Sequence, residues 1–209
     1  MQWGDPNDEE ASAKPLGSAQ AKLAPEFTVP ISADTPFSRL ADLDGYAPQV
    51  GFSNGFPAGR DPKSKQTWLT HCYGAVGVAR GYDPDSGNGS GLYTVIGHAP
   101  RHLDRNVAVV GRVVQGMELL SALPRGTGPL GFYEKAEQRM PINSVRLAAD
   151  VPEAQRSHLQ VLRSDSDSFA AVIDFRRNRR DDFYQSPAGH IELCNVQIPV
   201  REVPSKAGE

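Results

Sequence analysis

Residues 88–117 read NGSGLYTVIGHAPRHLDRNVAVVGRVVQGM, and this stretch decides the fold class. It contains two short runs of β-branched and aromatic residues, at 92–97 and 107–115, and turn-forming Gly, Pro, Asn or Asp residues bound each run. Such runs are typical of β-strands. Residues 116–123 follow with apolar side chains at helical spacing and a stop at Pro124, which predicts a short helix.

Further strands are predicted on both sides of this stretch. Residues 74–80 are small and apolar with interspersed glycines, and residues 142–148 alternate weakly between apolar and polar side chains. Residues 28–66 are rich in Gly, Pro, Ser and Asp, and proline repeatedly interrupts their short apolar runs. Short extended pieces remain at 27–29 and 49–52. We therefore expect a mainly antiparallel β body with little helix, in which 28–66 is an inserted loop with edge strands.

Residues 151–209 differ in composition and are expected to form an extension of this body. Residues 166–184 have the clearest helical pattern in the chain, with a serine placed to cap the first turn. The apolar face of this helix contains Phe169, Val172 and Ile173. Because that face is too narrow to be stable alone in water, we expect it to pack against the body.

The composition excludes several classes of protein. The chain has 39% hydrophobic residues, which argues against disorder throughout, and a net charge of -3, which gives no basic excess for nucleic acid. No apolar stretch is long enough to span a membrane. Cys72 and Cys194 match no metal spacing, which favours two buried thiols, while a disulfide between tail and body stays open for an exported protein.

Two short segments suggest metal binding only weakly. His98 and His102 have HxxxH spacing, but Pro100 between them argues against a helix that would place both rings on one face. Residues 83–89 have the acidic and glycine-rich character of a calcium loop but lack its later glutamate, so a plain turn is favoured. We therefore predict no metal site.

Four segments, in this order, resemble the cyclophilin family of peptidyl-prolyl cis-trans isomerases. Gln2-Trp3-Gly4-Asp5-Pro6 is similar to the family's Gln-Gly-Gly-Asp-Pro, and Pro25-Glu26-Phe27 to the Pro-x-Glu-Phe of bacterial members. Residues 74–80 resemble a strand that ends in Met-Ala-Arg. Residues 88–117 resemble the family's Asn-Gly-Ser-Gln-Phe-Phe, Leu-Asp and Phe-Gly-x-Val-x-x-Gly-Met in order, spacing and residue type.

The resemblance implies an antiparallel β-barrel closed by helices. It covers residues 1–150, which would supply the later strands and the second helix of a barrel that is incomplete at its N-terminus. Residues 151–209 lie outside it as a helical extension. An unrelated β-rich structural domain would require the match over 88–117 to be a coincidence.

The resemblance also implies which residues bind a proline-containing segment. In the family an apolar socket grips the proline ring, and hydrogen-bonding groups hold the neighbouring backbone. Gly91 replaces a glutamine, which removes one side-chain hydrogen bond, and Val107 stands where animal members have His. The implied substrate-binding residues are Gln2, Ala79, Arg80, Gly91, Tyr93, His102, Leu103 and Val107.

The implied activity is isomerisation of X-Pro bonds in other proteins, assisting their folding, with no cofactor. The barrier to rotation is about 18–20 kcal/mol, and a cationic donor to the prolyl nitrogen lowers it by weakening the amide resonance. The family's catalytic arginine precedes the Gln-Gly-Gly-Asp-Pro segment, which places it upstream of Met1, so no catalytic residue is assigned. We therefore expect the chain as given to be a poor isomerase.

The alternative is a non-catalytic cyclophilin-like module that binds Pro-containing segments. In both cases the implied partners are proline-containing polypeptides, without nucleic acid and without a membrane span. If a signal peptide precedes this chain in its parent protein, we expect a bacterial periplasmic protein.

Overall fold

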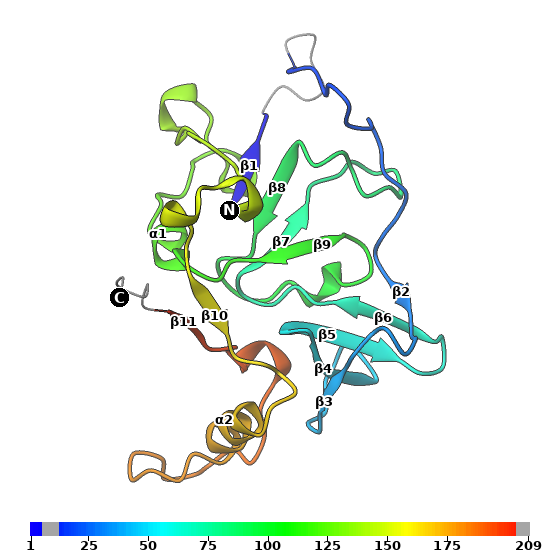
Figure 1. Ribbon diagram of the computed structural model, residues 1–209, viewed down its shortest axis with the longest axis vertical. Coiled ribbons are helices and arrows are strands. Elements are labelled where there is room, and N and C mark those ends of the chain that lie inside the picture. Colours follow the sequence, from blue (N-terminus) through cyan, green and yellow to red (C-terminus); the bar gives the residue numbers. More distant parts are fainter. Residues whose placement is uncertain (6–12, 204–209) are drawn as a thin grey trace.

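Two antiparallel sheets and a short two-stranded ribbon form the β structure in the computed structural model, which describes residues 1–5 and 13–203 (Figure 1). The four-stranded sheet has the order β1-β8-β7-β9, with bounds β1 Gln2–Gly4, β7 Ala75–Val78, β8 Gly91–Thr94 and β9 Val109–Arg112. The five-stranded sheet has the order β2-β6-β5-β4-β3, with bounds β2 Val29–Pro30, β3 Ser38–Leu40, β4 Gln49–Ser53, β5 Phe56–Asp61 and β6 Gln66–Leu69. The ribbon pairs β10 Leu159–Val161 with β11 Val200–Glu202.

Helices are few, as the sequence predicts. The two α-helices are α1 Met117–Ser121 and α2 Asp167–Asn178. Short 3-10 turns cover η1 Arg101–Leu103, η2 Pro129–Gly131, η3 Ala136–Gln138, η4 Ala148–Asp150, η5 Glu153–Gln155 and η6 Leu193–Asn195. Among the described residues, neither α-helix is long and apolar enough to cross a membrane.

The elements predicted around residues 88–117 are present. The predicted strands at 74–80, 92–97 and 107–115 correspond to β7, β8 and β9, each somewhat shorter than predicted. The predicted helix at 116–123 corresponds to α1. The mainly antiparallel β fold class is therefore confirmed.

Residues 28–66 are far more regular than the predicted loop with edge strands, because this region forms β2 to β5 and begins β6. Its centre is a hairpin in which Ser53 pairs with Phe56 across the turn Asn54-Gly55. Both turn residues have positive φ, 48° and 78°. Asn-Gly is the residue pair that favours this type of two-residue hairpin turn. The hairpin signal therefore outweighs the prolines, which the strands accommodate.

The strand predicted at 142–148 is not formed. Its residues are exposed, and apart from Ala148, which begins η4, they have no regular secondary structure. A strand needs a neighbour that pairs with its N–H and C=O groups, and no sheet of the described residues includes this segment. Weak alternation of apolar residues is therefore not sufficient to form a strand here.

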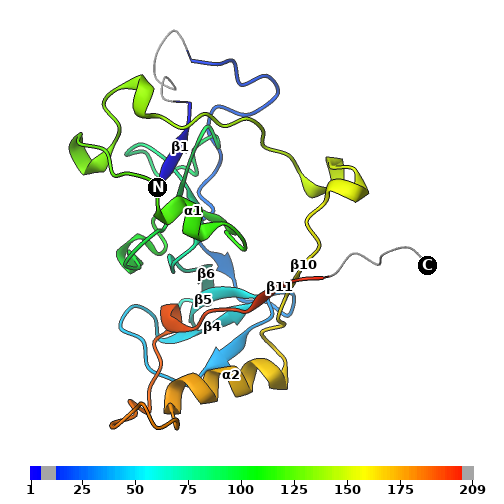
Figure 2. The same cartoon turned by 90° about the vertical axis from the view of Figure 1, so that its left-hand side faces the viewer.

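The tail helix α2 packs against the five-stranded sheet (Figure 2). Ser166 caps it by accepting a hydrogen bond from the Phe169 N–H, and the helix ends at Asn178, earlier than the predicted residue 184. Phe169 is 1% exposed, and its ring meets that of Phe52 edge to face at 4.9 Å. The sheet and the tail therefore share one core, in which the buried residues are Leu40, Ala47, Val50, Phe52, Trp68, Cys72, Phe169, Ile191, Leu193, Val196 and Ile198.

The two cysteines form a disulfide, which corrects the favoured prediction of two buried thiols. The bond joins Cys72, just after β6, to Cys194 in η6, across 122 positions of sequence. It therefore links the tail to the segment that connects the two sheets.

Candidate functional site

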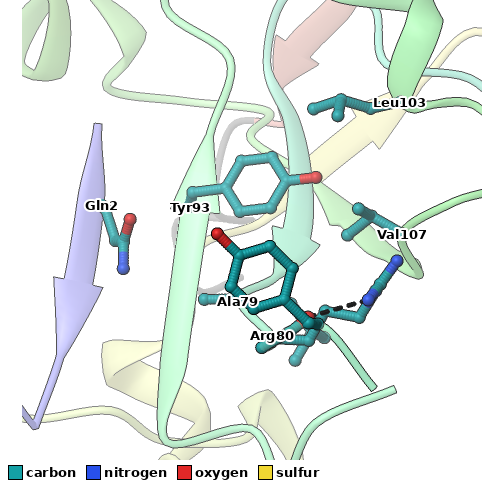
Figure 3. Close-up of a pocket in the computed structure, with 9 residues that line it drawn as sticks. Gln2, Ala79, Arg80, Tyr93, Leu103 and Val107 are labelled. Carbon is teal, nitrogen blue, oxygen red and sulfur yellow. Dashed lines mark hydrogen bonds between the residues drawn. The ribbon is translucent and has the colours of Figure 1, made fainter. Parts of the chain in front are cut away.

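A pocket of about 480 Å³ opens beside the four-stranded sheet (Figure 3). Strand β8 supplies Tyr93, whose ring extends toward Leu103 and Val107. Strand β1 supplies Gln2 on the other side of Tyr93. The complete lining is Gln2, Val78, Ala79, Arg80, Gly81, Tyr82, Tyr93, Leu103 and Val107.

The register of the sheet determines where the Tyr93 ring lies. In the antiparallel ladders, Tyr93 pairs with Gln2 of β1 and with Gly77 of β7. Directly paired residues of neighbouring strands have their side chains on the same face of the sheet. Gly77 has no side chain, so the space above it is filled by the Tyr93 ring.

A tight turn brings the other two apolar walls to the ring. In η1 and the residues after it, the Leu103 N–H donates to the Pro100 carbonyl and the Asn106 N–H donates to the Leu103 carbonyl, both at 2.9 Å. This compact path places Leu103 and Val107 at the same pocket. The walls combine an aromatic ring with two aliphatic side chains, a lining that suits an apolar group such as a proline ring.

Arg80 holds the rim of the pocket. Its Nε and Nη2 donate to the Asn106 carbonyl at 3.0 and 2.8 Å, and its Nη1 donates to the carbonyls of Gly81 and Asp83 at 2.8 and 2.9 Å. The guanidinium also lies 5.3 Å from the ring centre of Phe27. Four of its five N–H groups are thus used by backbone carbonyls of the pocket loops.

A series of buried polar side chains lies behind Tyr93. The Tyr93 hydroxyl is 2.7 Å from Nε2 of His71, and Nδ1 of His71 is 3.0 Å from Oδ1 of Asp104. The other oxygen of Asp104 accepts a hydrogen bond from Nε of Arg101 at 2.6 Å. Arg101 in turn donates to both carboxylate oxygens of Asp44, at 2.9 and 3.1 Å.

Burial and the hydrogen bonds and charges of this series shift three pKa values. Burial, with a smaller effect from the charge of Asp104, raises the pKa of Tyr93 to about 12. Burial alone would raise the pKa of Asp104, but hydrogen bonds from His71 and Arg101 outweigh it and lower that pKa. Burial likewise opposes the charge of Arg101, while the bonds to Asp44 and Asp104 raise its pKa overall. Tyr93 therefore keeps its proton, and Asp104 stays ionised, at neutral pH.

The structure brings together most of the residues expected to bind substrate. Gln2, Ala79, Arg80, Tyr93, Leu103 and Val107 all line the one pocket, whereas Gly91 and His102 are not among the lining residues. Gly91 has no side chain to reach the pocket, and its carbonyl accepts a hydrogen bond from the Ala79 N–H. His102 is exposed on η1.

Tyr82, which the sequence placed only at a possible groove edge, lies fully exposed at the pocket mouth. Two residues behind the pocket were given no role from the sequence. Asp104 belongs to the matched Leu-Asp pair, although that match gave it no role. His71 stands alone among small and apolar residues, so no spacing or motif marks it.

Metal ligands are not grouped anywhere in the described part of the chain. Within residues 1–5 and 13–203 there is no cluster of three or more His, Cys, Asp or Glu side chains that could hold a metal ion.

Comparisons with known proteins agree with this geometry. The model of the family described as cyclophilin type peptidyl-prolyl cis-trans isomerase/CLD matches residues 1–147. The solved structure of the cyclophilin AquaCyp293 from Hirschia baltica is similar, with a TM-score of 0.71 and 22% sequence identity over 96% of this chain and 71% of that chain. A search of curated proteins gives no match. The family match extends over most of the chain, which therefore belongs to the cyclophilin-type peptidyl-prolyl cis-trans isomerases, the proteins that isomerise X-Pro peptide bonds.

Proposed function

We propose that the isomerase binds its X-Pro segments in the Tyr93 pocket, and that its substrates are other proteins of a bacterial cell whose folding it assists. The observation that carries this proposal is the convergence of Tyr93, Leu103 and Val107 on one pocket with polar groups at its rim. Tyr93 lies in strand β8, whereas Leu103 and Val107 lie between β8 and β9, in and after the turn η1. Their meeting supports a single binding site.

The pocket can favour the twisted amide by treating the two ends of the X-Pro bond differently. The apolar walls hold the proline ring fixed, away from water. Gln2 lies opposite Tyr93, and its amide can donate to or accept from the substrate backbone. A site that holds one side of the amide and contacts the other can bind the twisted transition state better than either planar form. The barrier that this binding lowers is about 18–20 kcal/mol.

The disulfide supports an oxidising compartment. Such bonds persist in exported proteins and are rare in the cytosol. Cys72–Cys194 connects two parts of the core. We therefore propose that the parent protein is exported, in agreement with the periplasmic expectation.

A binding module without turnover is the second candidate. The hydrogen bonds that Arg80 makes to backbone carbonyls favour it. Among the described residues that line the pocket, Arg80 is the one cationic side chain, and backbone carbonyls take up most of its donors. It is therefore poorly placed to donate to a prolyl nitrogen. The same apolar walls would then bind proline without accelerating its isomerisation.

The test is the exchange between cis and trans forms of an Ala-Pro peptide, measured by NMR exchange spectroscopy. We expect the chain, as a poor isomerase, to accelerate exchange weakly but measurably, and Tyr93→Ala to lower kcat/KM by about 30-fold, since the loss of an aromatic wall at a binding centre costs about 2 kcal/mol. Tyr133→Ala, a tyrosine outside the pocket lining, serves as the control. Binding without faster exchange would support the module, and equal effects of the two variants would refute the Tyr93 pocket.

A further inference from the structure

His71 has a position that binding of substrate alone does not explain. Its side chain is completely buried, yet its Nε2 reaches the hydroxyl of Tyr93, which lines the pocket. The two rings are nearly parallel, with an interplanar angle of 10° and centroids 6.1 Å apart. A buried imidazole thus lies directly behind the aromatic wall of the site.

We propose that His71 is a positioning residue of the isomerase: its hydrogen bond to the Tyr93 hydroxyl fixes the ring that forms the pocket wall. His71 does not line the pocket, so it acts through Tyr93. The proposal rests on the proposed function of the Tyr93 pocket. It goes beyond that function by assigning a role to a residue behind the binding surface.

Asp104 determines which nitrogen of His71 carries the proton. Its Oδ1 lies 3.0 Å from Nδ1 of His71 and also accepts the His71 backbone N–H at 2.9 Å. An ionised carboxylate can only accept hydrogen bonds, so Nδ1 is the donor and the Nε2 of a neutral imidazole is left as an acceptor. The Tyr93 hydroxyl therefore donates to Nε2.

Arg101 and Asp44 keep Asp104 in place. Arg101 connects the two carboxylates, and its side chain and that of Asp44 are each only 1% exposed. Asp44 also accepts the backbone N–H groups of Tyr46 and Ala47, at 2.8 and 3.0 Å. The series from Asp44 to Tyr93 thus ends on backbone at one side and on the pocket wall at the other.

The Tyr93 ring is fixed at two places, its face and its hydroxyl end. Its face lies directly over Gly77, where no side chain intervenes. The hydrogen bond to His71 fixes the hydroxyl end, so the ring cannot swing away from Gly77. A ring that is already ordered loses less conformational freedom when proline binds, which improves affinity.

The test uses matched variants of His71 and Tyr93. Tyr93→Phe deletes the hydroxyl and keeps the ring. His71→Asn retains an amide near the position of Nδ1 but is too short to reach Tyr93, whereas the longer His71→Gln places its amide near the position of Nε2. Cis–trans exchange of the Ala-Pro peptide by NMR gives kcat and KM for each variant.

We expect His71→Asn to raise KM by about 5- to 10-fold, the equivalent of one hydrogen bond. His71→Gln should recover part of that loss. Adding His71→Asn to Tyr93→Phe should raise KM no further, because the two changes remove the same bond. A His71→Asn chain with lower Tm and unchanged KM would refute the proposal. So would a double variant whose rise in KM equals the combined effects of His71→Asn and Tyr93→Phe.

A second measurement separates this proposal from the function on which it rests. Cross-relaxation between the Tyr93 ring protons and the Gly77 α-protons reports the ring position without any substrate. Loss of this signal in the folded His71→Asn chain supports positioning, and its retention refutes it. Absence of peptide binding and turnover in the wild-type chain refutes the proposed function, while the ring signal still decides the role of His71.

Discussion

Gly77 lies opposite Tyr93 in the ladder between β7 and β8, and the tyrosine ring occupies the space where a side chain at position 77 would project. A Cβ atom placed on Gly77 would lie 2.4 Å from both Cζ and Oη of Tyr93. Real Cβ contacts are not that short, so any larger residue must displace the ring. The glycine is therefore a requirement of the pocket wall.

Gly77→Ala should weaken substrate binding. We expect the displaced ring to raise KM for an X-Pro peptide by about 10-fold and the overpacking to lower the free energy of unfolding by about 1–3 kcal/mol. Peptide titration by NMR and urea unfolding measure the two effects.

Gly97→Ala is the matched control, because a Cβ at position 97 meets nothing within 4 Å. It should leave both KM and stability close to those of the wild type. Wild-type KM in the Gly77→Ala chain would show that the ring can move without affecting the pocket.

Arg80→Lys should impair the site almost as much as Arg80→Ala. The guanidinium reaches the carbonyls of Asn106, Gly81 and Asp83 at once, and an ammonium group cannot reproduce that geometry. We expect KM to rise by about 5- to 10-fold in both variants as the rim loosens, in line with the loss of one or two charged hydrogen bonds. The exposed Arg146→Lys is the control.

The kcat of the Arg80 variants tests the role of the arginine itself. A scaffold residue should change KM more than kcat. If Arg80→Ala abolishes kcat while peptide affinity is retained, Arg80 acts on the twisted amide and its assignment to the rim is wrong.

The apolar walls of the pocket could be predicted because the resemblance to the cyclophilins over 88–117 implied them. Tyr93 lies in β8, and Leu103 and Val107 lie in and after the tight turn η1. Strand and turn patterns predicted these elements but gave the three side chains no role. The structure brings them to one pocket.

The sequence predicted isolated edge strands in 28–66 but not their assembly into a five-stranded sheet, because the prolines received more weight than one turn. Pro57 lies within β5 and pairs with Phe52, and Pro30 lies in the short strand β2. The Asn54-Gly55 turn was the informative signal. Pairing between distant strands, as between β2 and β6, has no local signature in the sequence.

The support behind the pocket could not be predicted from spacing. His71 and Asp104 are 33 positions apart, and Arg101 and Asp44 are 57 apart. A single buried histidine among apolar residues has no periodicity. Its partners become evident only when the fold brings the carboxylates to it.

Asp42→Asn should destabilise the docked tail. The Asp42 side chain is 5% exposed and accepts hydrogen bonds from Nε of Arg177, at 3.1 and 3.0 Å, and from the Ile191 N–H at 3.0 Å. We expect a loss of about 1.5–3 kcal/mol in the free energy of unfolding at pH 7, the range for hydrogen bonds to charged groups. Asp165→Asn, which breaks the exposed pair with Arg163, should cost less than about 1 kcal/mol.

The effect of Asp42→Asn should also depend on pH. Burial opposes ionisation of Asp42, but the bonds from Arg177 and Ile191 outweigh it and lower the pKa below its usual 3.8. A carboxylate with a lowered pKa contributes stability above its ordinary pKa and loses it as pH falls through the folded-state pKa. The difference between wild type and variant should therefore be full at pH 6 and shrink below about pH 4. A difference that is constant down to pH 2.5 would contradict this.

Reduction of Cys72–Cys194 should destabilise the chain and weaken peptide binding together. The bond closes a loop across 122 positions, for which chain entropy predicts about 5 kcal/mol, with measured losses of about 2–5 kcal/mol in comparable cases. Cys72 directly follows His71, so loosening this segment should also disturb the support of Tyr93. Urea unfolding and peptide titration, with and without reductant, measure both effects.

The Cys72→Ala/Cys194→Ala double variant should show the same losses and no response to reductant. If reduction lowers stability but leaves peptide affinity unchanged, the disulfide holds only the tail and has no influence on the pocket.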